Sequence, residues 1–84
     1  MKPGFKFKNE NMDFSVILFA GTERKNVALL LQENTSCPFI TVRDLSELKN
    51  GNYDWVWGHY FKNFNRALKD YFERQNSLRR QQIK

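Results

Sequence analysis

Few residues of this sequence are suited to acid–base or nucleophilic chemistry. His59 is the only histidine, Asp54 precedes it by five positions, and Cys37 is the only cysteine. A Cys–His pair can form a nucleophile with its base. Cys37, however, precedes a proline in a predicted turn, and no catalytic signature surrounds either residue. A lone histidine beside tryptophans is typical of a packed, hydrogen-bonded side chain. We therefore expect no catalytic residue and a protein that is not an enzyme.

The same scarcity argues against metals and cofactors. One cysteine and one histidine fall short of a four-ligand zinc site. The four glycines are too far apart for a phosphate-binding loop. A single cysteine forms no internal disulfide, the N-terminus has no apolar signal core, and the apolar runs 16–20 and 27–31 are too short to span a bilayer. We expect a cytoplasmic protein without metal, cofactor or membrane contact.

The most distinctive segment is Trp-Val-Trp-Gly-His-Tyr-Phe, residues 55–61. One interpretation is an exposed aromatic platform that stacks on bases or anchors a partner protein. The other is that Trp55, Trp57 and Phe61 fill the interface between a sheet and a helix, with Gly58 ending the strand. We favour the second, because a domain this small needs its large rings inside.

Charge is concentrated at the two ends of the chain. The net charge is +5, and residues 26–61 are slightly acidic. Basic ends indicate an anionic partner, for example nucleic acid with cations on phosphates and Phe5 or Phe7 on bases, although they also serve solubility, and the N-terminus could simply fray. The candidate binding residues, from the aromatic segment and the basic ends, are Lys6, Lys8, Trp55, Trp57, His59, Arg74, Arg79 and Arg80.

Hydrophobic periodicity predicts the elements that must position these residues. Alternation predicts strands over 12–20, 27–32 and 39–43, with a fourth over 53–57. In the first strand Phe14, Val16 and Leu18 should share one face. The spacing over 44–47 is that of a capping box and predicts one helical turn. An apolar stripe including Phe64, Leu68 and Phe72 predicts an amphipathic helix over 63–81 with Asn63 as N-cap.

The order of these elements predicts an α+β fold, a three- or four-stranded antiparallel sheet with one long C-terminal amphipathic helix on one face. Residues 1–84 form a single domain, with a basic N-terminal segment (1–10) and a basic C-terminal tail (79–84). The helix covers only one sheet face, and the other carries apolar residues at 17, 19, 28 and 30. We therefore expect that face to bind a partner or to pair in a homo-oligomer.

The C-terminal half has a further resemblance. A short strand, then Trp-x-Trp-Gly-His-Tyr-Phe, then an amphipathic helix with Ala67, Leu68 and Tyr71 resembles small accessory proteins encoded by bacteriophages and prophages. The resemblance implies a non-enzymatic modulator of host machinery, including defence systems, and carries no functional residues with it. We expect a protein that binds, and inhibits or sequesters, a host protein or an anionic small ligand. The alternative is a nucleic-acid-binding protein that uses its basic termini and aromatic residues.

Overall fold

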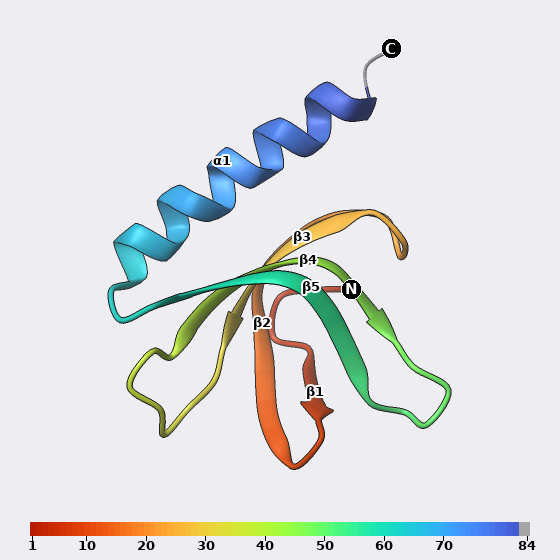
Figure 1. Cartoon of the computed structure of the whole chain (residues 1–84), viewed down its shortest axis with the longest axis vertical. Coiled ribbons are helices and arrows are strands. Elements are labelled where there is room, and N and C mark those ends of the chain that lie inside the picture. The colour runs from red at the N-terminus through yellow and green to blue at the C-terminus, as the bar shows by residue number, and fades with distance from the viewer. Residues whose placement is uncertain (83–84) are drawn as a thin grey trace.

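The fold is a five-stranded antiparallel sheet followed by one helix (Figure 1). The computed structural model of the chain describes residues 1–82, so Lys84 of the expected basic tail lies outside the described residues. The strands lie in the sheet in chain order, each paired with the next. The α+β class and the C-terminal helix are confirmed, but three or four strands were too few. The elements are β1 (Lys6–Asn9), β2 (Met12–Gly21), β3 (Asn26–Leu31), β4 (Phe39–Glu47), β5 (Tyr53–Phe61) and α1 (Phe64–Gln82).

Strand β1 lies in the segment that we expected to be a basic terminus, open to fraying. Lys6 and Lys8 are exposed, whereas Phe7 between them is only 6% exposed. This alternation is that of a strand with one buried face. Phe7 lies opposite Phe14 of β2, and the two rings stack with centroids 5.5 Å apart. The buried ring of Phe7 and the backbone pairing with β2 together hold the terminus in the sheet.

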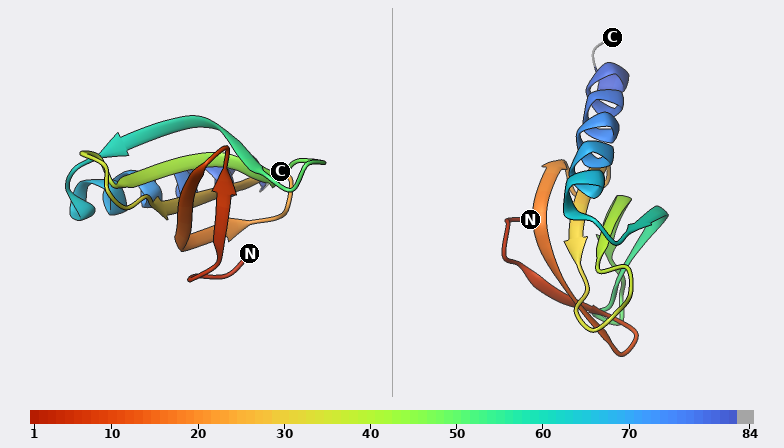
Figure 2. Two further views of the ribbon diagram at one scale, coloured as in Figure 1. Left: turned by 90° about the horizontal axis from the view of Figure 1, so that it is seen from below. Right: turned by 90° about the vertical axis from the view of Figure 1, so that its left-hand side faces the viewer.

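The sheet bends until β1 faces the first half of β5 (Figure 2). The ring of Phe7 lies 5.0 Å from that of Tyr53 and 6.3 Å from that of Trp55, measured between centroids. The bend encloses one core, made of Phe7, Phe14, Val16, Ala28, Leu30, Ile40, Val42 and Leu45, with Phe19, Tyr53 and Trp55 packed against it. The face that we expected to be open to a partner is therefore filled by the sheet itself, and that expectation was wrong.

A β-bulge in β2 changes which residues share a face. Val16 lies opposite Leu30, but Leu18 lies opposite Leu29, so Ile17 is an extra residue in the ladder. Beyond an extra residue the alternation reverses. Phe19 consequently joins the enclosed core, while Ile17 and Leu18 pack toward the helix. The expectation that Leu18 shares a face with Phe14 and Val16 was wrong for this reason.

Helix α1 covers the other face of the sheet. Its Ala67, Tyr71 and Leu78 are buried against Val27 and Leu29 of β3. The helix begins as expected, because the Asn63 side-chain oxygen accepts a hydrogen bond from the Arg66 backbone N–H at 3.2 Å. The buried stripe is narrower than expected, since Phe64 and Phe72 remain 39% and 48% exposed. No helix in the described part of the chain is long and apolar enough to cross a membrane.

Strand β4 continues through 44–47, where we expected a helical turn. Asp44 adopts a positive φ of 55°, and the register with β5 shifts between Arg43 and Ser46. The following residue, Leu45, exchanges two hydrogen bonds with the fully buried side chain of Asn26. These bonds replace the strand partner that β3 no longer provides, and they hold the segment extended.

Candidate functional site

The candidate site is built around a bulge in β5. Thr41 lies opposite His59, but Arg43 lies opposite Val56, so Trp57 and Gly58 together face a single residue of β4. Gly58 therefore does not end the strand, which continues to Phe61. A Cβ on Gly58 would lie 3.2 Å from the Trp55 indole nitrogen and 3.3 Å from the Tyr60 ring. Glycine lets both rings approach the backbone at this point.

The bulge sends the two tryptophans to different environments. Trp55 packs inside the curled sheet, edge-on to Phe14 at a centroid distance of 5.1 Å. Trp57, held at a φ of 50°, is 70% exposed. Phe61 packs with the residues beneath the helix. The expectation that all three rings fill the sheet–helix interface thus holds for Phe61 alone.

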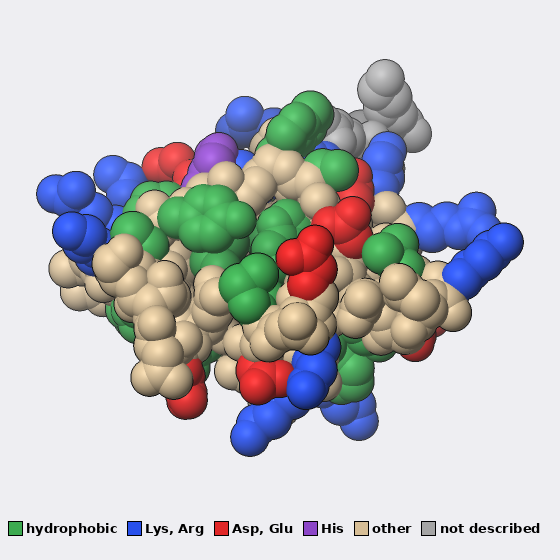
Figure 3. Space-filling model, turned by 60° about the horizontal axis from the view of Figure 1, so that its bottom comes forward, with side chains coloured by type: hydrophobic (Ala, Val, Ile, Leu, Met, Phe, Trp, Pro, Cys, Tyr) green, Lys and Arg blue, Asp and Glu red, His purple; other side chains and the backbone are tan. Residues whose placement is uncertain are grey.

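Trp57 is one of three exposed large hydrophobic side chains on a strand at the edge of the sheet. Val56 is 45% and Tyr60 is 56% exposed, and we call Val56, Trp57 and Tyr60 the β5 patch. β5 is the last strand in the sheet order. Figure 3 shows hydrophobic side chains gathered beside the single histidine, with lysines and arginines at the flanks. The Arg43 guanidinium lies over the Trp57 ring, 5.6 Å from its centroid, a cation–π contact.

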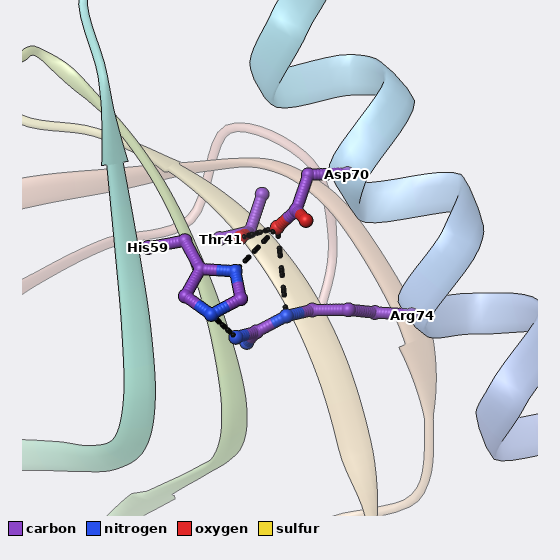
Figure 4. Close-up of polar contacts among 4 residues, drawn as sticks. All are labelled: Thr41, His59, Asp70 and Arg74. Carbon is purple, nitrogen blue, oxygen red and sulfur yellow. Dashed lines mark hydrogen bonds and ion pairs between the residues drawn. The ribbon is translucent and has the colours of Figure 1, made fainter.

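Beside this patch, four polar side chains meet between the sheet and the helix (Figure 4). Thr41 projects from β4, His59 from β5, and Asp70 and Arg74 from α1. Oδ2 of Asp70 accepts a hydrogen bond from the Thr41 hydroxyl and lies 2.9 Å from Nδ1 of His59 and 3.5 Å from Nε of Arg74. The Nη2 atom of Arg74 lies 2.7 Å from Nε2 of His59.

These contacts fix the protonation of the His59 ring in this arrangement. A guanidinium only donates hydrogen bonds, so Nε2 of His59 must accept from Arg74. The ring proton is then on Nδ1, which donates to Asp70. His59 is thus the neutral link between a cation and an anion. The lone pair on Nε2, the only one in the ring that could accept a proton, already accepts the hydrogen bond from Arg74.

Burial and charge oppose each other at both ionised members of the network. Burial raises the pKa of Asp70, but the hydrogen bonds from Thr41 and His59 and the electrostatic attraction of His59 and Arg74 outweigh it and lower the pKa overall. The pKa of Arg74 is lowered, first by burial and then by the nearby charge of Arg43, against the raising effect of Asp70. Nη1 of Arg74 is buried without a hydrogen-bond partner in the described part of the chain.

The remaining candidate residues do not join this site. Lys6 and Lys8 are exposed on β1, where Lys8 makes a surface ion pair of 3.8 Å with Asp13. Arg79 and Arg80 are exposed on the last turns of α1, and Figures 1 and 2 place these turns at the opposite end of the molecule from β1. The structure therefore gathers His59 and Arg74, places Trp57 beside them, and packs the half-buried Trp55 elsewhere.

Sequence reasoning missed three residues of the site, namely Thr41, Arg43 and Asp70. Asp70 and Arg74 are four apart on a helix, a spacing that indicates an ion pair, and the structure contains that pair. Nothing in the sequence placed that pair over Thr41 and His59. Among residues 1–82 no three His, Cys, Asp or Glu side chains lie close enough together to hold a metal ion. Comparisons with protein-family models, curated proteins and solved structures gave no significant match.

Proposed function

We propose that this chain is a small, non-enzymatic accessory protein of the phage type, which binds and sequesters a host protein in the cytoplasm through the β5 patch. The observation that carries the proposal is the state of Trp57, which is 70% exposed on a backbone with a φ of 50°. The resemblance of the segment around it to phage accessory proteins supports the proposal.

Two features of Trp57 each reduce the folding free energy of the chain. An L-residue in the left-handed region costs about 1–2 kcal/mol relative to ordinary backbone. A large ring left in water also forgoes the burial that this small domain needs. Strained residues of this kind persist mainly at functional sites, and bulges re-aim side chains there. Tryptophan and tyrosine are also the residues that most often dominate protein–protein interfaces.

The state of His59 favours binding over catalysis. A general base needs a free lone pair within reach of a substrate proton. In this structure the Nε2 lone pair of His59 accepts from Arg74, and the side chain of Arg74 is only 11% exposed. The network thus fastens the helix to the sheet beside the patch.

The proposal is tested by comparing aromatic residues that are similarly exposed. We expect a tagged chain to capture a defined protein from a bacterial lysate, and Trp57→Ala and Tyr60→Ala to abolish that capture. Phe72→Ala is the matched control, because Phe72 is 48% exposed but lies on the helix. Unchanged capture by Trp57→Ala, with a folded variant by circular dichroism, would falsify the proposal.

Nucleic-acid binding remains the alternative proposal. It requires the basic ends to act together, but β1, which carries Lys6 and Lys8, lies at the opposite end of the molecule from the last turns of α1 (Figure 1). The separation favours the β5 patch instead. Binding to DNA or RNA that weakens steeply between roughly 50 and 200 mM salt would support the alternative. Affinity that is undetectable, or insensitive to salt, would remove it.

A further inference from the structure

Arg74 has more hydrogen-bonding capacity than its neighbours use. Its Nε lies 3.5 Å from Asp70 and its Nη2 lies 2.7 Å from His59. Its Nη1 is buried and has no hydrogen-bond partner among the described residues. A buried donor without a partner costs about 1–3 kcal/mol, and more on a charged group. Such a group is a place where an acceptor from another molecule would be stabilised.

A second arginine lies next to it. Thr41 and Arg43 are two apart on β4 and so share its helix-facing side, while Asp70 and Arg74 are one helical turn apart on α1. Because Thr41 donates to Asp70, Arg43 falls beside Arg74, and its charge lowers the pKa of Arg74 after the larger effect of burial. Asp70 lies against the guanidinium of Arg74, and Arg43 adds a second positive charge beside it.

We propose that Arg43 and Arg74 together bind an oxyanion, a phosphate or a carboxylate, at the edge of the β5 patch. Two guanidinium groups offer the paired donors that such anions prefer. The inference rests on the proposed function, because the oxyanion is the group that a partner docked on Trp57 presents. The partner thus combines an apolar group for Trp57 with an acidic group beside it.

Access to Nη1 requires a side chain to move. Arg43 rests on the exposed ring of Trp57, so this stack lies on the solvent side of the site. We expect the oxyanion to draw Arg43 away from the ring as it binds. The environment of Trp57 then changes, and its fluorescence reports the binding.

The experiment uses the chain with Trp55→Phe, which leaves Trp57 as the only tryptophan of the two. It is titrated with inorganic phosphate and with acetate, against chloride at equal ionic strength. We expect a saturable change in Trp57 emission with one of the two oxyanions, and which one responds identifies the group. Arg43→Gln should weaken the apparent affinity about tenfold or more, as expected for the loss of a charged hydrogen bond. Lys49→Gln, which removes an exposed charge in the loop before β5, should leave it unchanged.

If Trp55→Phe does not fold, the melting temperature of the otherwise unaltered chain replaces fluorescence, with the same anions and the same two variants. A response that only follows ionic strength, or that is equal in Arg43→Gln and Lys49→Gln, overturns the inference. The proposed function fails separately. If Trp57→Ala keeps partner capture while phosphate or acetate still saturates, the oxyanion site stands and the docking surface does not.

Discussion

Nδ1 of His59 and Oδ2 of Asp70 lie 2.9 Å apart, and this contact joins strand β5 to helix α1. The same carboxylate oxygen accepts from Thr41, whose side chain is fully buried. A single oxygen therefore fastens the helix to two strands at the place where Trp57 is displayed. The stability of this attachment depends on the negative charge of Asp70.

Acid should weaken this attachment in a defined pH range. The pKa of Asp70 in the folded chain lies below its ordinary value of 3.8, because hydrogen bonds and electrostatic attraction to His59 and Arg74 outweigh burial. The folded state therefore binds the proton less tightly than the unfolded state, and the stabilisation is complete above pH 3.8 and lost as pH falls through the lower, folded-state pKa. We expect Asp70→Asn to lower the melting temperature at pH 6, and this difference to shrink below about pH 4.

The control for this prediction is Asp13→Asn. Asp13 has a side chain that is 81% exposed and a weak contact with Lys8 at 3.8 Å. Exposed ion pairs contribute about 0–1 kcal/mol. Its substitution should change the melting temperature little at any pH. A constant difference between Asp70→Asn and the unaltered chain from pH 6 to pH 2 would contradict the assignment.

A second prediction concerns the buried amide of Asn26. Its Nδ2 donates to the carbonyls of Thr22 and Leu45, and its Oδ1 accepts from the Leu45 N–H. Asn26→Ala would leave the Leu45 groups buried without partners, at about 1–3 kcal/mol for each. We expect a loss of at least about 2 kcal/mol of unfolding free energy in urea. Asn11→Ala, at an exposed turn, should cost less than about 0.5 kcal/mol.

A stable Asn26→Ala variant would mean that the β4 segment after Arg43 is held by other contacts. The experiment thus also tests why this segment is extended. The capping-box spacing over 44–47 predicted a helical turn there. The tertiary bonds from Asn26, which lies 19 positions before Leu45, override that local signal.

The elements that could be predicted from sequence are those with a regular period. The helix and its N-cap follow from a 3.6-residue stripe and from Asn63, and the cores of β2 and β3 follow from apolar alternation. Bulges break the period without a strong sequence signal. The bulge at Ile17 sends Phe19 to the enclosed core, and the bulge at Trp57 separates the two tryptophans. Alternation alone therefore assigned these faces wrongly.

The candidate site was predictable only in part for a similar reason. His59 and Arg74 are visible as chemistry-bearing residues in the sequence. Whether these two side chains come into contact depends on how α1 crosses the sheet, which is set by the packing of Ala67 and Tyr71 on β3. The prediction of an open sheet face was wrong, because ring contacts between β1 and β5 close that face and β1 was not predicted as a strand.

A third prediction separates the effect of backbone strain at Trp57 from the effect of the contacts made by its ring. Trp57→Gly relieves a backbone φ of 50° and loses an exposed cation–π contact. Glycine adopts positive φ freely, and such a contact contributes only about 0.5–1 kcal/mol. We expect the unfolding free energy to stay constant or to rise by up to about 1 kcal/mol, while partner capture is lost.

The matched variant is Asp44→Gly, at the neighbouring bulge with a φ of 55°. It relieves the same kind of strain and also removes a carboxylate whose Oδ1 is buried without a hydrogen-bond partner among residues 1–82. It should raise stability and preserve capture. If both glycine variants lose capture, the bulge geometry and not the Trp57 ring is what the partner requires.

The last prediction concerns Phe7, which closes the sheet from β1. Its ring contacts Phe14, Tyr53 and Trp55, and the residue is only 6% exposed. Phe7→Ala should cost about 3–5 kcal/mol, the usual range for truncating a buried ring. Total stabilities of small domains are about 5–15 kcal/mol, so this variant should approach unfolding at room temperature.

Phe5→Ala provides the comparison, since Phe5 is 38% exposed and makes only an edge contact with Tyr53 and a looser stack with Phe7. That change should cost about 1 kcal/mol, as for an average substitution. Urea unfolding measures the loss of unfolding free energy in both variants, and equal losses would show that the Phe7 ring of β1 does not close the core.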